Sequence, residues 1–297
     1  MSLYRTRTSP LSSRLAGVSI LLLIFIAAAV HANTPISTLV SPNWLNAHLL
    51  DTDLLIIDTR EATLYEQAHI PGAINIPVNE TFAASSNTYR VAGLPQIKAL
   101  FSRHGINHHD NIIVYDDGRF IDAARFFWVL EVYGHEHVSL MDGGIPQWLQ
   151  AGLPIENEPR QRPATTYIPT ISHQRLTTKM AMQIALSNSA VHIIDARTHE
   201  EYSGEKSIAD RSGHIPGAVN IPWLVNMHEM SGLQKLLSDA ELAEHYQAYQ
   251  GQQVITYCNR GKQSALTYFT LRHLGYDVSV YDGAWLEWAN DQSLPIE

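Results

Sequence analysis

Cysteine is almost absent from this sequence of 297 residues, in which Cys258 is the only example. A single cysteine excludes an internal disulfide, so folding must depend on ordinary hydrophobic cores. The hydrophobic content of 45% is typical of such cores. Because stabilising cysteines come in pairs, the isolated Cys258 is a candidate reactive thiol.

Basic residues are also scarce, with 20 Lys and Arg against 29 Asp and Glu. Three arginines precede an apolar run over residues 15–30 and a small-residue pattern that ends at Ala32; they are Arg5, Arg7 and Arg14. This order is typical of a secretory signal peptide over residues 1–32, removed after Ala32. An uncleaved anchor is the alternative, but a run of 16 residues is short for a membrane span. The sequence therefore predicts an exported, periplasmic protein that leaves the membrane after cleavage.

Loss of the signal peptide leaves 17 basic residues against 29 acidic ones, a formal charge of −12. An acidic chain of this kind excludes nucleic acid and anionic membrane as partners. Any site for an anion must then be a local basic pocket.

Cys258 lies at the end of an apolar, β-branched run over residues 253–257. A short loop with Arg260 and Lys262 follows, and then a helical pattern over Gln263–His273. A strand end, a helix N-terminus and two cations favour the thiolate, and loop N–H groups can converge on one anion. The alternative is a buried cysteine that acts as a small hydrophobe.

The same loop argues against a phosphatase. Cysteine-dependent phosphatases clamp phosphate with an arginine six residues after the cysteine, and this chain has Ser264 there. Sulfur chemistry fits the loop better than phosphorus chemistry.

The chain contains an internal repeat of roughly 140 residues. An Asp-x-Arg motif occurs at Asp58 and Asp195, and His69–Pro77 matches His214–Pro222 at eight of nine positions. Short apolar strands alternate with helical stretches in each copy, which predicts two α/β domains, each with a parallel sheet flanked by helices on both faces. We assign an N-terminal domain to residues 36–156, a proline-containing linker to 157–170 and a C-terminal domain to 171–297.

Alignment of the copies on their central strands places Asp116 opposite Cys258. The first domain therefore lacks the nucleophile, and Asp116 is interpreted as a structural or helix-capping residue. One domain is predicted to be active and the other inactive.

These motifs, twice in the same order, resemble the rhodanese family of sulfurtransferases over residues 36–297. The resemblance implies a cysteine persulfide on Cys258, a cradling loop of Asn259, Gly261, Gln263 and Ser264, and a site between the domains. It also implies that Arg211 lies in the substrate pocket and that Arg197 is structural or close to the site. An ion pair of Arg197 with neighbouring acidic residues is equally favoured. The loop of Cys258 differs from the common loops of two-domain members and resembles that of small exported single-domain rhodaneses.

Two loop cations, Arg260 and Lys262, favour a small dianionic donor such as thiosulfate. We predict transfer of its sulfane sulfur to cyanide or another thiophilic acceptor by covalent catalysis, with no metal or organic cofactor. The alternatives are a 3-mercaptopyruvate sulfurtransferase, or a persulfide carrier that delivers sulfur to a protein partner.

Overall fold

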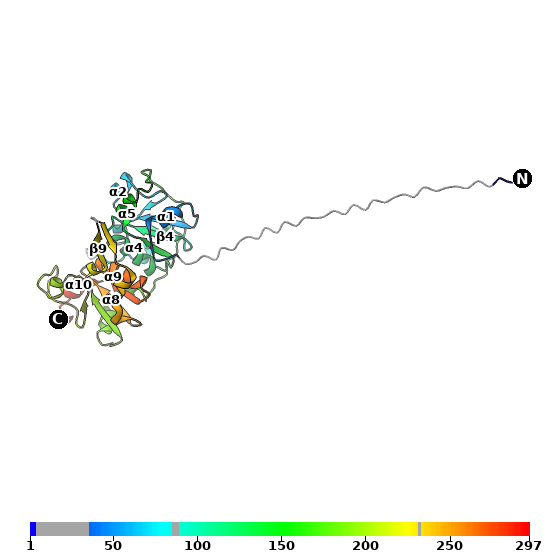
Figure 1. The fold of residues 1–297 in the computed structure, drawn as a ribbon. Coiled ribbons are helices and arrows are strands. Elements are labelled where there is room, and N and C mark those ends of the chain that lie inside the picture. Colours follow the sequence, from blue (N-terminus) through cyan, green and yellow to red (C-terminus); the bar gives the residue numbers. More distant parts are fainter. Residues whose placement is uncertain (4–35, 85–88, 231–232) are drawn as a thin grey trace. The chain divides into compact units, whose positions relative to one another are not determined.

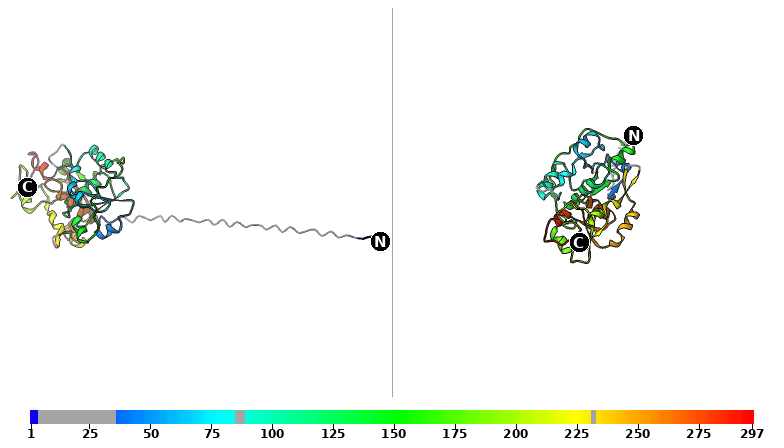
Figure 2. Two further views of the ribbon diagram at one scale, coloured as in Figure 1. Left: turned by 90° about the horizontal axis from the view of Figure 1, so that it is seen from above. Right: turned by 90° about the vertical axis from the view of Figure 1, so that its left-hand side faces the viewer.

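The structure is a computed structural model that describes residues 1–3, 36–84, 89–230 and 233–297. The described residues from 36 onward belong to one compact unit (Figure 1). That unit contains two parallel five-stranded sheets, in the orders β1-β5-β4-β2-β3 and β6-β12-β11-β7-β8. The two orders correspond strand by strand, as the sequence repeat predicts. In Figure 2, right, the blue-to-green and yellow-to-red segments occupy adjacent regions.

The first domain alternates strands and helices along its whole length. Its strands are β1 (Leu39–Val40), β2 (Leu54–Asp58), β3 (Ile74–Asn75), β4 (Asn111–Tyr115) and β5 (Val138–Met141). Its helices are α1 (Pro42–Ala47), α2 (Ala62–Gln67), the 3₁₀ helix η1 (Val78–Thr81), α3 (Leu94–Arg103), α4 (Ile121–Val132) and α5 (Gly144–Gln150).

The second domain repeats this order with one insertion. Its strands are β6 (Leu176–Thr177), β7 (Val191–Asp195), β8 (Val219–Asn220), β9 (Met227–Met230), β10 (Leu233–Leu236), β11 (Gln253–Tyr257) and β12 (Asp277–Tyr281). Its helices are α6 (Lys179–Ala185), α7 (His199–Tyr202), η2 (Trp223–Asn226), α8 (Asp239–Tyr246), η3 (Gln247–Tyr249), α9 (Gln263–His273) and α10 (Ala284–Ala289).

Buried strand residues alternate between the two faces of each sheet because successive side chains point in opposite directions. In β4, Ile112 and Val114 join the core that contains α3 and α4, whereas Ile113 and Tyr115 join the core that contains Trp148 of α5. Helices therefore cover both faces, which confirms the predicted fold class.

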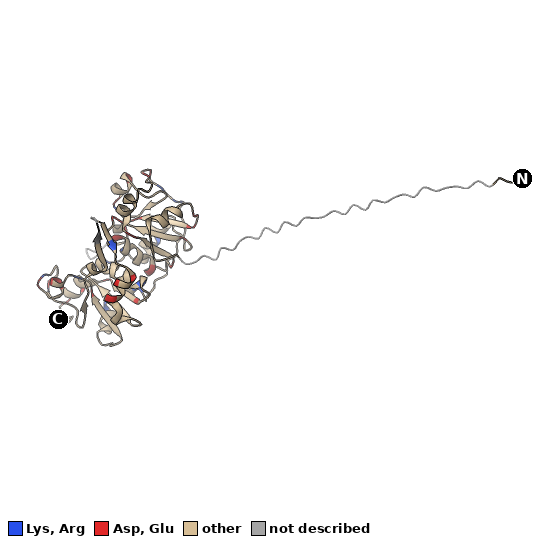
Figure 3. Cartoon of the chain, in the orientation of Figure 1, with Lys and Arg blue, Asp and Glu red and all other residues tan. Residues whose placement is uncertain are grey.

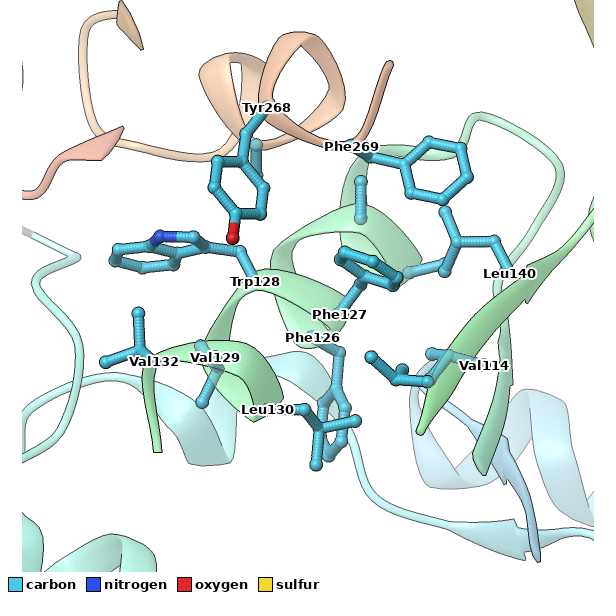
Figure 4. Close-up of a cluster of buried hydrophobic side chains, with 14 of the residues drawn as sticks. Val114, Phe126, Phe127, Trp128, Val129, Leu130, Val132, Leu140, Tyr268 and Phe269 are labelled. Atoms are coloured by element: carbon cyan, nitrogen blue, oxygen red, sulfur yellow. The ribbon is translucent and has the colours of Figure 1, made fainter. Parts of the chain in front are cut away.

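The two domains share a core through α4 and α9. Phe127 of α4 contacts the ring of Phe269 of α9 edge-on, with centroids 5.1 Å apart. Figure 4 shows these side chains beside Trp128 and Tyr268, between the green and orange helices. Since α4 and α9 each follow the central strand of their domain, this packing brings the loops after β4 and β11 to the domain boundary.

The inserted hairpin β9–β10 is the only antiparallel sheet of the described residues, and the repeat pattern did not predict it. Leu233 and Gln234 line a pocket together with Gly118 and Arg119 of the first domain. In the other direction, the backbone N–H of Val91 donates to Asp282 of the second domain at 3.1 Å. Each domain thus contributes a segment that contacts the other domain: the hairpin β9–β10 lies by Gly118 and Arg119, and Val91 bonds to Asp282.

The predicted linker, residues 157–170, contains no helix or strand and runs against the first domain. Tyr167 is fully buried, and Arg162 pairs with Asp110 at 2.8 Å. The exact limits of the domains remain a prediction. The predicted signal peptide lies almost wholly outside the described residues, among which no helix is long and apolar enough to cross a membrane.

Candidate active site

Cys258 directly follows β11 and is 1% exposed. Its sulfur accepts a hydrogen bond from the backbone N–H of Gly261 at 3.1 Å and from the Ser264 hydroxyl at 3.4 Å. The residue that stands in place of the phosphatase arginine is thus a direct partner of the thiol. Hydrogen bonds of this kind favour a sulfur that carries negative charge.

Other residues of the second domain also contact the loop. The carbonyl of Cys258 accepts from the N–H of Trp285 at 2.8 Å, and the amide of Asn259 donates to Glu201 at 2.6 Å. Gly261 has φ +79°, a left-handed conformation that favours glycine. The helix α9 begins at Gln263, as the sequence predicts. These contacts hold the loop in one conformation around the sulfur.

A pocket of about 410 Å³ opens over Cys258 and is built from both domains. The second domain contributes Ile208, Cys258, Asn259, Arg260, Lys262 and Gln263, and the first contributes Tyr89, Arg119, Ile121 and Asp122. The predicted position of the site between the domains agrees with this lining.

Three cations line the pocket, in different settings. Lys262 pairs with Asp122 of the first domain at 2.5 Å, and Arg119 pairs with Asp117 at 2.8 Å. Arg260 is exposed and lies over the ring of Tyr89, 5.1 Å from its centroid. Within the described residues, Arg260 has no carboxylate within ion-pair distance. Its charge is therefore the one most available to an anionic ligand.

Lys and Arg residues occur along both domains of a chain in which Asp and Glu are more numerous (Figure 3). The pocket over Cys258 brings together Arg119, Arg260 and Lys262 in this acidic chain.

Arg211 does not reach the pocket, contrary to the expectation from family resemblance. Its guanidinium donates to four backbone carbonyls at the end of α10 and beyond it, those of Ala289, Leu294, Trp288 and Asp291, at 2.6–3.2 Å. Carbonyls at a helix C-terminus lack intrahelical partners, and a guanidinium satisfies several of them at once. Arg211 therefore has a structural role in this conformation.

Arg197 is also absent from the pocket lining. It is 0% exposed, pairs with Asp195 at 2.6 Å and donates to the carbonyl of Gly213 at 2.8 Å. Arg60 pairs with Asp58 in the first domain at the same distance, 2.6 Å. Because the pair recurs in the domain without a cysteine, it supports the fold. The structure thus shows the ion-pair alternative for Arg197, with Asp195 as its partner.

Five pocket residues escaped sequence reasoning. Ile208 belongs to the second domain, and the other four come from the first domain: Tyr89, Arg119, Ile121 and Asp122. A partial signal existed for three of them. Arg119, Ile121 and Asp122 follow β4 in the segment that aligns with the Cys258 loop, and the repeat places the two loops at equivalent strand ends. Tyr89 carried no signal, since it lies in a loop between elements.

In the first domain, the carboxylate of Asp116 occupies the place equivalent to the thiol. It accepts backbone N–H groups from Gly118 at 2.8 Å, Phe120 at 3.3 Å, and Asp122 and Ala123 at 3.2 Å each. Burial and the nearby Asp117 raise the pKa of Asp116 to about 6, against the effect of these N–H donors. The structure thus supports the interpretation of Asp116 as a capping residue, and its loop is filled by its own side chain.

Comparison with known proteins shows which family shares this fold and site. The model of the Rhodanese-like domain matches residues 41–151 and 181–291. The chain belongs to the rhodanese family. It is 31% identical over 263 residues to the thiosulfate sulfurtransferase of Pseudomonas aeruginosa, covering 87% of this chain and 96% of the relative. It is 31% identical over 264 residues to the thiosulfate sulfurtransferase of Azotobacter vinelandii, with the same coverage, 87% and 96%.

Among solved structures, the rhodanese fold of the 3-mercaptopyruvate sulfurtransferase SseA from Escherichia coli is similar. The TM-score is 0.74 at 27% identity, over 84% of this chain and 99% of that one. The predicted family and its two-domain rhodanese fold are confirmed, and named relatives belong to the predicted enzyme class, sulfurtransferase.

Proposed function

We propose that this rhodanese transfers the outer sulfur of thiosulfate to a thiophilic acceptor through a persulfide on Cys258. The observation that carries the proposal is the arrangement at the sulfur. A thiol with two hydrogen-bond donors, Gly261 and Ser264, lies under a pocket that presents Arg260. Curated relatives named thiosulfate sulfurtransferases support the choice of donor.

The first half-reaction forms one sulfur–sulfur bond and breaks another. The Cys258 thiolate attacks the outer sulfur of thiosulfate, and sulfite leaves with the electron pair of the bond that breaks. Arg260 and Lys262 stabilise the charge that develops on the departing sulfite. The N–H of Gly261 and the hydroxyl of Ser264 hold the nucleophile before the attack and orient the persulfide after it.

The second half-reaction returns the enzyme to its starting state. An acceptor such as cyanide attacks the outer sulfur of the persulfide, thiocyanate forms, and Cys258 leaves as the thiolate. No external oxidant or reductant is needed, and the two half-reactions predict ping-pong kinetics. The chemistry uses no metal or organic cofactor.

A second donor, 3-mercaptopyruvate, is favoured by a specific feature of the pocket. Asp122 neutralises Lys262, and this leaves less positive charge for a dianion than the sequence suggests. The similarity to SseA points the same way. The values of kcat/KM for the two donors, measured under the same conditions with cyanide as acceptor, distinguish the candidates. A preference for 3-mercaptopyruvate would overturn the thiosulfate assignment.

The third candidate is a persulfide carrier that delivers its sulfur to a protein. A pocket of about 410 Å³ leaves space beside a small donor for a larger acceptor group. A carrier would form a stable persulfide with thiosulfate but turn over slowly with cyanide. Rapid turnover with cyanide supports the enzyme assignment instead.

Export completes the proposal. The signal-peptide pattern of residues 1–32 supports secretion to the periplasm, where a protein with one cysteine cannot be trapped in an internal disulfide. Fractionation of cells that express the full chain, with the N-terminus determined by mass spectrometry, tests this. A chain that keeps Met1 and stays in the cytosol would refute it.

A further inference from the structure

Arg125 is a fully buried arginine of α4, in the domain that lacks the nucleophile. Its Nη1 donates to the carbonyl of Gly261 in the catalytic loop at 3.0 Å. Its Nη2 donates to the carbonyl of Tyr89 at 2.9 Å and lies 3.5 Å from Asp282. One guanidinium therefore contacts both the loop that carries Cys258 and the segment that carries the opposite pocket wall.

The contact with Gly261 is close enough to constrain that residue. A Cβ atom added to Gly261 would lie 2.8 Å from Arg125 Nη1, well inside van der Waals contact. The same glycine donates its N–H to the sulfur of Cys258 at 3.1 Å. Arg125 is thus separated from the nucleophile by a single residue, which it contacts at the backbone.

The surroundings hold the guanidinium in place. It lies 4.3 Å from the ring centroid of Trp128 and 5.5 Å from that of Phe82. Burial lowers the pKa of Arg125, while the charges of Asp282 and Cys258 oppose that effect. A buried cation is costly unless it is paired and hydrogen-bonded, and here two of its partners are the carbonyls of Gly261 and Tyr89 at the active site.

The sequence repeat shows that this arrangement is not a general feature of the fold. Arg125 lies nine residues after Asp116, and the equivalent residue nine after Cys258 is Thr267. Thr267 is also buried, but it carries no charge. The arginine at this position of the first domain therefore has no charged counterpart in the second.

We propose that Arg125 is a positioning residue, through which the first domain holds the catalytic loop and Tyr89 in the conformation needed for sulfur transfer. The inference rests on the proposed role of Cys258 as the nucleophile. Arg125 is absent from the pocket lining, so it acts through the Gly261 peptide and through Tyr89, over which Arg260 lies. The domain without the nucleophile then contributes to catalysis by holding the loop that carries it.

The test compares Arg125→Lys with a matched control, Arg272→Lys. Arg272 of α9 also crosses the boundary, where it pairs with Glu131 of α4 at 2.9 Å, and among the described residues it has no hydrogen bond or ion pair to the loop of Cys258. The first readout is the rate of persulfide formation from thiosulfate in a single turnover, followed by intact mass. We expect the rate at saturating donor to fall at least tenfold in Arg125→Lys, with less than a twofold change in the half-saturating concentration. The control should stay within twofold of the wild type in both quantities.

A second readout does not depend on the donor. The alkylation rate of the single cysteine by iodoacetamide is measured at pH 10 and at pH 7, and the ratio of the two rates removes differences in access. We expect this ratio to rise several-fold in Arg125→Lys, because a displaced Gly261 N–H no longer donates to the sulfur. The control should leave it unchanged. If the wild type forms no persulfide with thiosulfate, the proposed donor is wrong, and the alkylation ratio alone still decides the role of Arg125.

If Arg125→Lys fails to fold, as judged by urea unfolding, the double variant Arg125→Met/Asp282→Asn replaces it. This variant removes both buried charges together, so that neither is left without its partner. The double variant should show the same fall in the rate of persulfide formation and the same rise in the alkylation ratio. The proposal is overturned if the rate and the ratio stay within twofold of the wild type, if Arg272→Lys shows equal losses, or if only the half-saturating concentration changes.

Discussion

The buried carboxylate of Asp116 gives a quantitative prediction about stability and pH. Its pKa of about 6 lies above the ordinary value of 3.8, chiefly because the side chain is buried. A tenfold change in an equilibrium constant is about 1.4 kcal/mol, so ionisation of Asp116 in the folded state costs about 3 kcal/mol more than in the unfolded chain. The corresponding stability is present below pH 3.8 and is lost as the pH rises through about 6.

Replacement of Asp116 by Asn removes this titration. The amide group keeps one acceptor oxygen but turns an NH₂ donor toward the N–H groups of Asp122 and Ala123, which then have no acceptor. That loss costs about 1–3 kcal/mol at every pH. Relative to the wild type, the variant should therefore be destabilised most at pH 4, and by about 3 kcal/mol less at pH 7, where the two effects nearly cancel.

Urea unfolding of both proteins at several pH values between 4 and 7 measures the difference directly, because titrations elsewhere in the chain are common to both. Two stability curves that run parallel over this range would refute the reasoning. A gap that widens toward neutral pH would show that Asp116 is stabilised in its charged form, the opposite of what its burial implies.

Three further predictions concern the site. Cys258→Ser should abolish sulfur transfer and leave the urea midpoint within experimental error; turnover near the wild-type rate would exclude the persulfide. Ser264→Ala removes one hydrogen bond to the sulfur, so persulfide formation should slow roughly fivefold, which corresponds to about 1 kcal/mol. An unchanged single-turnover rate would show that the hydroxyl does not contribute to this step. Lys262→Glu places a second carboxylate beside Asp122, so the ratio of kcat/KM for thiosulfate to that for 3-mercaptopyruvate should fall about tenfold. Lys262→Gln is its uncharged control and should give a smaller fall, whereas a ratio that is unchanged, or that moves toward thiosulfate, would show that Lys262 does not select the donor.

Much of the fold could be predicted because it depends on local patterns and on their repetition. Apolar runs predicted β4 and β11, and the helix Gln263–His273 matches its predicted limits. The position of Cys258 at a strand end followed from the same run. Parallel strands between helices then required a sheet with both faces covered.

The pocket could not be predicted at the same level, because it depends on contacts between distant segments. The family resemblance placed Arg211 in the substrate pocket, yet its partners are backbone carbonyls that no spacing reveals. The ion pair of Arg197 with Asp195, by contrast, was one of the two alternatives drawn from the sequence. Arg125 reaches the loop of Cys258 because α4 packs on α9, and Tyr89 lies beside it through a hydrogen bond to Arg125. A charge in the sequence shows what a side chain can bind, and its tertiary neighbours decide whether it is free to do so.

The most direct test of the account is the intact mass of the purified mature protein after brief treatment with thiosulfate and removal of the excess. The account predicts a gain equal to one sulfur atom, placed on Cys258 by peptide mapping, lost on addition of cyanide and absent from Cys258→Ser. A mass that does not change with thiosulfate, or a sulfur atom that remains in Cys258→Ser, would contradict it.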